Sequence, residues 1–74
     1  MSALVMWTIY DHPADYPDSF VARRWVVDAQ GARSTDRVLV SDDVNWLRRQ
    51  FIEDGLSCLV RDARDDPAVM ETWV

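Results

Sequence analysis

The fold is decided by the stretch SDDVNWLRRQFIEDG, residues 41–55, which holds the clearest helical pattern in the chain. Val44, Leu47 and Phe51 follow one another at i, i+3 and i+7, so a helix places their side chains on one face. Ile52 widens that face. The sequence therefore predicts an amphipathic helix that packs its apolar side against another element.

The two ends of this helix carry their own signals. Ser41 or Asp42 can accept hydrogen bonds from the free backbone N–H groups of the first turn. The acids there also suit the positive end of the helix. Gly55 fits the left-handed backbone that often ends a helix.

The rest of the chain favours strands, because it is rich in β-branched and aromatic residues. Strands are expected over residues 4–10, 20–28, 35–40, 56–61 and 68–74, with turns over 28–34 and 62–67. Gly31 is the expected positive-φ residue of the first turn. Short connections favour antiparallel pairing. The predicted fold class is α+β: residues 1–74 form a single domain with a largely antiparallel five-stranded sheet and one helix on one face, in the order βββ-α-ββ.

The predicted helix is too short to cover the whole sheet. About 13 residues span about 20 Å, which covers about three strands spaced about 4.8 Å apart. The strand at 20–28 is nevertheless apolar on both faces. We therefore expect apolar surface to remain exposed, as at the interfaces of homodimers or of protein partners.

Size and charge exclude several function classes. A chain of 74 residues and 8.6 kDa leaves no room for a core plus a large enclosed pocket, so a cofactor-dependent enzyme is not expected. A net charge of −5 opposes direct binding to nucleic acid or anionic lipid and permits a basic partner. No apolar run approaches the ~20 residues of a membrane span. Residues 1–9 lack a basic start, so no signal peptide is expected and the location predicted is cytoplasmic.

The residues that carry catalytic or metal chemistry are few. The single cysteine, Cys58, excludes an internal disulfide and is expected to be buried in a strand. His12 with Asp11 or Asp15 offers the weakest hypothesis, an acid–base or metal cluster. Nucleotide and zinc motifs are absent. We therefore predict no catalytic site, no metal and no cofactor.

Acidic residues gather in clusters with two interpretations. One cluster starts the helix and a second lies in the last turn; the residues are Asp42, Asp43, Asp62, Asp65 and Asp66. Solvated caps and turns explain each cluster separately. The alternative is one acidic rim that binds an Arg/Lys-rich surface of another protein or of a ribonucleoprotein.

Tryptophan is abundant, with four residues in the chain. Trp7 and Trp25 lie in predicted strands and are expected in the core. Trp46 lies off the apolar face of the helix, and Trp73 is next to the C-terminus. Those two are the candidate interface anchors, because Trp is enriched at binding hot spots.

Several short strings carry a resemblance. The strings WTIY (7–10), DYPD (15–18), FVARRW (20–25), DDP (65–67) and ETW (71–73) resemble a family of small proteins of proteobacterial and phage genomes. That family implies no activity. In size, charge and lack of a catalytic motif, the chain is also similar to small acidic anti-CRISPR proteins of type I systems. This similarity implies a stoichiometric inhibitor that binds Cas subunits of the surveillance complex and keeps target DNA from its basic channel.

Three hypotheses of function follow. The first is a non-enzymatic interaction module, such as an anti-CRISPR inhibitor, that binds through the acids and the two anchor tryptophans. The second is a self-associating regulatory or housekeeping domain that forms a homodimer. The third and weakest is an enzyme that uses His12.

Overall fold

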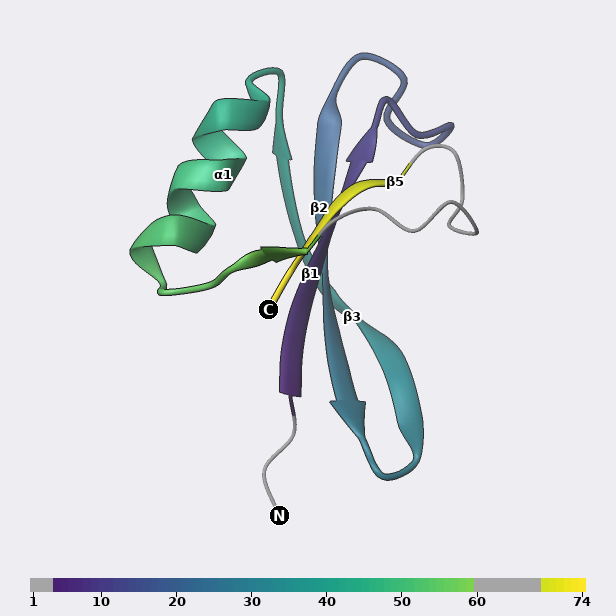
Figure 1. Ribbon diagram of the computed structural model, residues 1–74. Coiled ribbons are helices and arrows are strands. Elements are labelled where there is room, and N and C mark those ends of the chain that lie inside the picture. Colours follow the sequence, from purple (N-terminus) through teal and green to yellow (C-terminus); the bar gives the residue numbers. More distant parts are fainter. Residues whose placement is uncertain (1–3, 60–68) are drawn as a thin grey trace.

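The computed structural model describes residues 4–59 and 69–74, which form one sheet and one helix (Figure 1). The elements are β1 (Leu4–Asp11), β2 (Phe20–Asp28), β3 (Gly31–Ser41), α1 (Val44–Glu53), β4 (Cys58–Leu59) and β5 (Val69–Trp73). The five strands lie in the order β3-β2-β1-β5-β4, and every neighbouring pair is antiparallel. This confirms the predicted α+β fold and its βββ-α-ββ order.

The third strand begins earlier than the sequence predicted, at Gly31 rather than at residue 35. Asp28 pairs with Gly31 across a short turn, and Gly31 has the expected positive φ, of 113°. The Asp28 carboxylate accepts from the Gln30 N–H at 2.8 Å and pairs with Arg33 at 2.5 Å. These side-chain bonds close the turn early, so residues that looked like loop from their polarity belong to the hairpin.

The fourth strand begins later than predicted, at Cys58 rather than at residue 56. Among the described residues, Cys58–Leu59 pairs with β5 as a strand. The Leu56 N–H bonds instead to the carbonyl of Phe51 at 2.9 Å, so Leu56 completes the end of the helix. Residues 60 and 61, the turn predicted over 62–67 and residue 68 lie outside the described residues.

The N-cap of α1 is Asp43, which corrects the expectation of Ser41 or Asp42. Asp43 is the last extended residue before the helix, with φ −116° and ψ 105°, and its carboxylate accepts from the Asn45 N–H at 2.9 Å. The Ser41 hydroxyl oxygen accepts from the backbone N–H of Asp43, which precedes the first residue of the helix. Gly55 ends the helix with φ 79°, as predicted.

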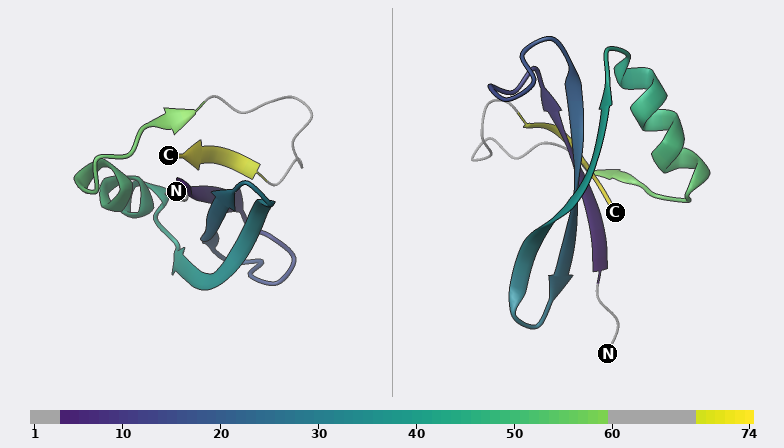
Figure 2. Two further views of the ribbon diagram at one scale, coloured as in Figure 1. Left: turned by 90° about the horizontal axis from the view of Figure 1, so that it is seen from below. Right: turned by 180° about the vertical axis from the view of Figure 1, so that it is seen from behind.

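The main buried cluster lies between α1 and the centre of the sheet (Figure 2), while Val21 and Thr8 are buried on the opposite face. Leu47 and Phe51 are buried, as their spacing predicted. They pack with four buried residues of β1, β2 and β5: Trp7, Ile9, Ala22 and Trp73. These are three adjacent strands, which matches the reach of a short helix. Ile52 is 61% exposed instead, because it lies 100° around the helix from Phe51.

A partly buried ion pair holds the helix to the sheet beside this core. The Arg48 guanidinium donates to both carboxylate oxygens of Glu71, at distances of 2.8 to 3.1 Å. The indole N–H of Trp73 donates to the same carboxylate at 3.1 Å. The hydrogen bond to Glu71 raises the pKa of Arg48. One carboxylate thus satisfies donors on both α1 and β5.

Removal of this carboxylate should destabilise the fold. We expect Glu71→Ala to lower the free energy of unfolding by about 1–2 kcal/mol, because it leaves the Trp73 N–H and the Arg48 guanidinium without their acceptor. The Arg48–Glu71 pair is partly exposed, so solvent screens it and limits the loss of unfolding free energy to this range. Urea denaturation measures it against Glu53→Ala, an exposed site where a change within about 0.5 kcal/mol is expected. Equal losses in the two variants would contradict the role given to Glu71.

Candidate functional site

The start of α1 brings together three of the residues that the sequence singled out. Asp42 and Asp43 are exposed, and the Trp46 side chain follows one turn later with 40% exposure. The Trp46 N–H bonds to the Asp43 carbonyl at 3.1 Å, so the helix itself fixes their spacing. We call Asp42, Asp43 and Trp46 the helix-start surface.

The electrostatics of this surface are simple. The first turn of α1 carries an N-terminal partial positive charge, which stabilises the Asp43 carboxylate that caps it. Within residues 4–59 and 69–74, neither Asp42 nor Asp43 forms an ion pair. Two solvated carboxylates beside an exposed indole can receive a cationic group and an apolar contact together.

Trp73 does not join this surface. It is 6% exposed, its ring packs 5.7 Å from the Phe51 ring, and its indole N–H is bonded to Glu71. A position next to the C-terminus suggested exposure, but β5 pairs with the central strand β1 and so carries Trp73 into the core. Of the two candidate anchors, Trp46 is the exposed one.

The second acidic cluster cannot be compared with the first. Asp62, Asp65 and Asp66 lie outside the described residues. The single acidic rim therefore stays a prediction, and the helix-start surface is its described part.

The two strand tryptophans lie on opposite faces of the sheet. Trp7 is buried against Phe51 with ring centroids 5.3 Å apart, as predicted. Trp25 pairs in register with Met6, whose side chain points away from α1. Trp25 is only partly buried, so it belongs to the open face and not to the core under the helix. This corrects the expectation for Trp25: β2 is apolar on both faces, so its sequence did not indicate which face the helix would cover.

Of the two acids considered with His12, the structure brings one, Asp11, into contact with the imidazole ring. The His12 ring contacts the carboxylate of Asp11 and lies edge-on to Phe20, with ring centroids 4.9 Å apart. Asp15 pairs with Arg23 at 2.6 Å instead. In the part of the chain that the structure describes, no three His, Cys, Asp or Glu side chains gather as a metal site.

Cys58 is exposed, which corrects the expectation of a buried thiol. Cys58 lies on β4, which is at the edge of the sheet and has a neighbouring strand on one side only. Partial desolvation raises the pKa of the thiol, the Glu71 carboxylate adds to the rise, and Arg48 opposes it.

Among the described helices, none is long and apolar enough to cross a membrane.

Comparisons of the chain with protein-family models, with curated proteins and with solved structures found no match. They therefore leave the resemblances stated above as expectations. The case for a function rests on the surfaces described here.

The cap assignment predicts a contrast between two variants. Asp43→Ala should lower the free energy of unfolding by about 1 kcal/mol, because the Asn45 N–H loses its acceptor. Asp43→Asn keeps an acceptor oxygen and should lower the free energy of unfolding by only a few tenths of the loss expected for Asp43→Ala. The comparison therefore separates the effect of the negative charge from the effect of the capping hydrogen bond. Thermal and urea denaturation measure both. A larger loss of unfolding free energy in Ser41→Ala than in Asp43→Ala would show that Ser41, and not Asp43, caps the helix.

The thiol should show its raised pKa in its reactivity. We expect the rate of Cys58 modification by a disulfide reagent to rise with pH at a higher midpoint in the folded chain than in urea. The folded state holds this proton more tightly, so the thiol's contribution to stability is present below its ordinary pKa and is lost as pH rises through the raised value. Glu71→Gln should lower the midpoint, since it removes the carboxylate and leaves Arg48. An unchanged midpoint would contradict the contribution assigned to Glu71.

Proposed function

We propose that the chain is a non-enzymatic protein-interaction module that binds a basic surface through the helix-start surface. The observation that carries the proposal is an indole, Trp46, that is 40% exposed beside two exposed carboxylates. Tryptophan contributes large contact area when a partner covers it, and such residues dominate the energy of many interfaces. The carboxylates add selectivity for Arg and Lys.

The partner class follows from the charge. A net charge of −5 disfavours nucleic acid as the direct partner and favours a protein or ribonucleoprotein with a basic channel. Together with the resemblance to small acidic inhibitors, this supports a specific version: the chain binds Cas subunits of a type I CRISPR surveillance complex and competes with target DNA. In this proposal the protein works in the cytoplasm of a phage-infected cell.

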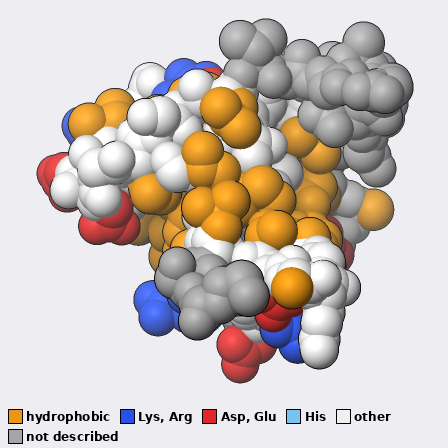
Figure 3. Space-filling view, turned by 60° about the horizontal axis from the view of Figure 1, so that its bottom comes forward, with side chains coloured by type: hydrophobic (Ala, Val, Ile, Leu, Met, Phe, Trp, Pro, Cys, Tyr) orange, Lys and Arg blue, Asp and Glu red, His pale blue; other side chains and the backbone are white. Residues whose placement is uncertain are grey.

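Self-association is the second candidate, and the exposed apolar surface favours it. Apolar side chains gather across the middle of one side of the molecule (Figure 3). Leu4, Ile52 and Leu59 are among the large hydrophobic residues that are roughly half exposed or more, at 53%, 61% and 48%. A second copy could cover such surface. Sedimentation equilibrium distinguishes the candidates, because a stable dimer has twice the mass of 8.6 kDa at micromolar concentration.

The binding experiment uses a purified type I surveillance complex on a biosensor surface. We expect the chain to bind it stoichiometrically and to prevent binding of labelled target DNA. Trp46→Ala should raise the Kd about 30-fold, the factor that corresponds to a hot-spot loss of about 2 kcal/mol. The double variant Asp42→Asn/Asp43→Asn should also bind more weakly, with a shallower dependence on salt.

The matched control changes charge at the other end of the same helix. Glu53→Gln/Asp54→Asn removes two acids as well, and both residues are exposed. Its Kd should stay within about twofold of the original chain. Equal weakening by both double variants would show a general charge effect and overturn the role of the helix-start surface. A chain that binds no Cas subunit and sediments as a dimer would overturn the inhibitor version.

A further inference from the structure

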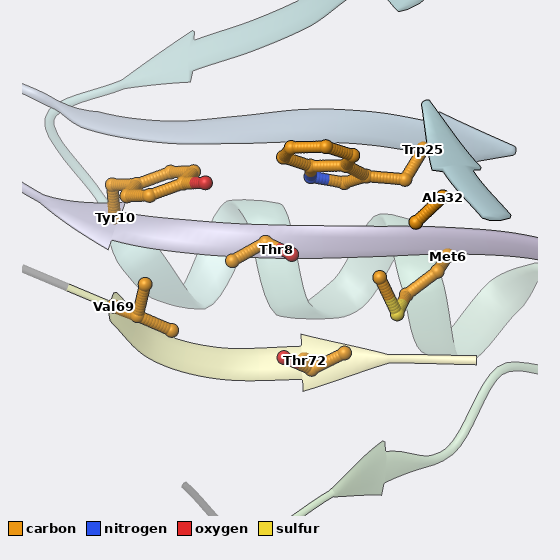
Figure 4. A pocket seen from close by; sticks show the side chains of 7 residues that line it. All are labelled: Met6, Thr8, Tyr10, Trp25, Ala32, Val69 and Thr72. Carbon is orange, nitrogen blue, oxygen red and sulfur yellow. The ribbon is translucent and has the colours of Figure 1, made fainter. Parts of the chain in front are cut away.

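The sheet carries a groove on the face opposite α1 (Figure 4). Its volume is about 340 Å³, within the roughly 300–1,000 Å³ that ligand pockets usually have. Strand β1 supplies the middle of the lining and its neighbours β2 and β5 supply the sides. Six of the lining residues are Met6, Thr8, Tyr10, Trp25, Val69 and Thr72.

Trp25 holds the one fully buried side-chain polar atom among the described residues that lacks a hydrogen-bond partner. Its indole nitrogen is buried, and no acceptor lies within hydrogen-bond distance. Buried indole N–H groups usually find an acceptor, as Trp73 does with Glu71. In Figure 4 the nitrogen lies on the edge of the ring turned toward Thr8 and Tyr10. The unused donor therefore lies beside the groove, where neighbouring side chains cover it.

The remaining lining combines apolar surface with a few hydroxyl groups. Met6 and Val69 are apolar, while Thr8 and Thr72 bring hydroxyls from adjacent strands. A mostly apolar hollow with a small number of convergent polar groups is typical of sites for small molecules. Arg23 lies opposite Thr8 on this face and already pairs with Asp15 at 2.6 Å. With that pairing and a net charge of −5, the groove favours a neutral molecule over an anion.

We propose that this groove binds a small neutral apolar molecule that carries a carbonyl oxygen, with the Trp25 indole N–H as the donor to that oxygen. The surrounding side chains cover the nitrogen in the structure, so binding includes a turn of the Trp25 ring toward the ligand. The site is independent of the helix-start surface, since the two lie on opposite sides of the sheet.

The test uses two probes of matched shape, 1-tetralone with a carbonyl and tetralin without one. The intact chain, labelled with ¹⁵N, gives one indole signal for each of its four tryptophans. We expect 1-tetralone to shift the Trp25 signal saturably and to leave the Trp46 signal in place. Tetralin should bind about fivefold more weakly, the factor expected for one hydrogen bond.

A conservative variant isolates the donor. Trp25→Phe keeps an aromatic ring but has no N–H, so it should bind the two probes equally. Trp46→Phe, on the exposed side of α1, should keep the original preference for 1-tetralone. The comparison of probes on the original chain stands even where Trp25→Phe fails to fold.

Three outcomes would overturn the proposal. They are no saturable shift of the Trp25 signal up to the solubility limit of 1-tetralone, equal affinity of the original chain for both probes, and an unchanged preference in folded Trp25→Phe. None of them bears on binding to Cas subunits, so this test and that of the proposed function fail separately.

Discussion

Phe51 lies between the rings of Trp7 and Trp73, and this three-ring contact joins the only described helix to the middle of the sheet. Truncation of a buried Phe commonly costs about 3–5 kcal/mol, while small domains have only about 5–15 kcal/mol of stability in total. A chain of this size therefore depends heavily on one contact. The Arg48–Glu71 pair lies beside it and fixes the direction in which α1 crosses the strands.

A single short helix divides the sheet into two chemically different faces. Its ten residues span about 15 Å, and they pack over β2, β1 and β5 and also contact β3, while the described residues place no helix on the opposite face. The covered face holds the cluster of buried side chains around Phe51. The other face keeps partly exposed apolar side chains and a groove. The same packing turns Trp46 outward, because Leu47 and Phe51 use the inner side of the helix.

Local features of the fold could be predicted from the sequence, and contacts between distant segments could not. The helix, its inner face and Gly55 follow from spacing within one segment, and so does the grouping of Asp42, Asp43 and Trp46. The strand order β3-β2-β1-β5-β4 pairs the last strand with the first, and no local periodicity encodes that pairing. Trp73 therefore looked like a surface residue and lies in the core, while Cys58 looked buried and lies on an edge strand.

The indole N–H groups of Trp73 and Trp25 lie on opposite faces of the sheet and differ in whether they have a hydrogen-bond acceptor. The Trp73 N–H has an acceptor because Glu71 lies two residues before it, on the same strand face, where Arg48 of α1 holds the carboxylate in place. In residues 4–59 and 69–74, no helix lies over the open face to orient an acceptor in this way, and the Trp25 N–H there is buried without a partner. A buried donor without an acceptor is costly, so such positions persist where they have another use. The face that α1 does not cover thus carries both the unpaired Trp25 donor and the groove.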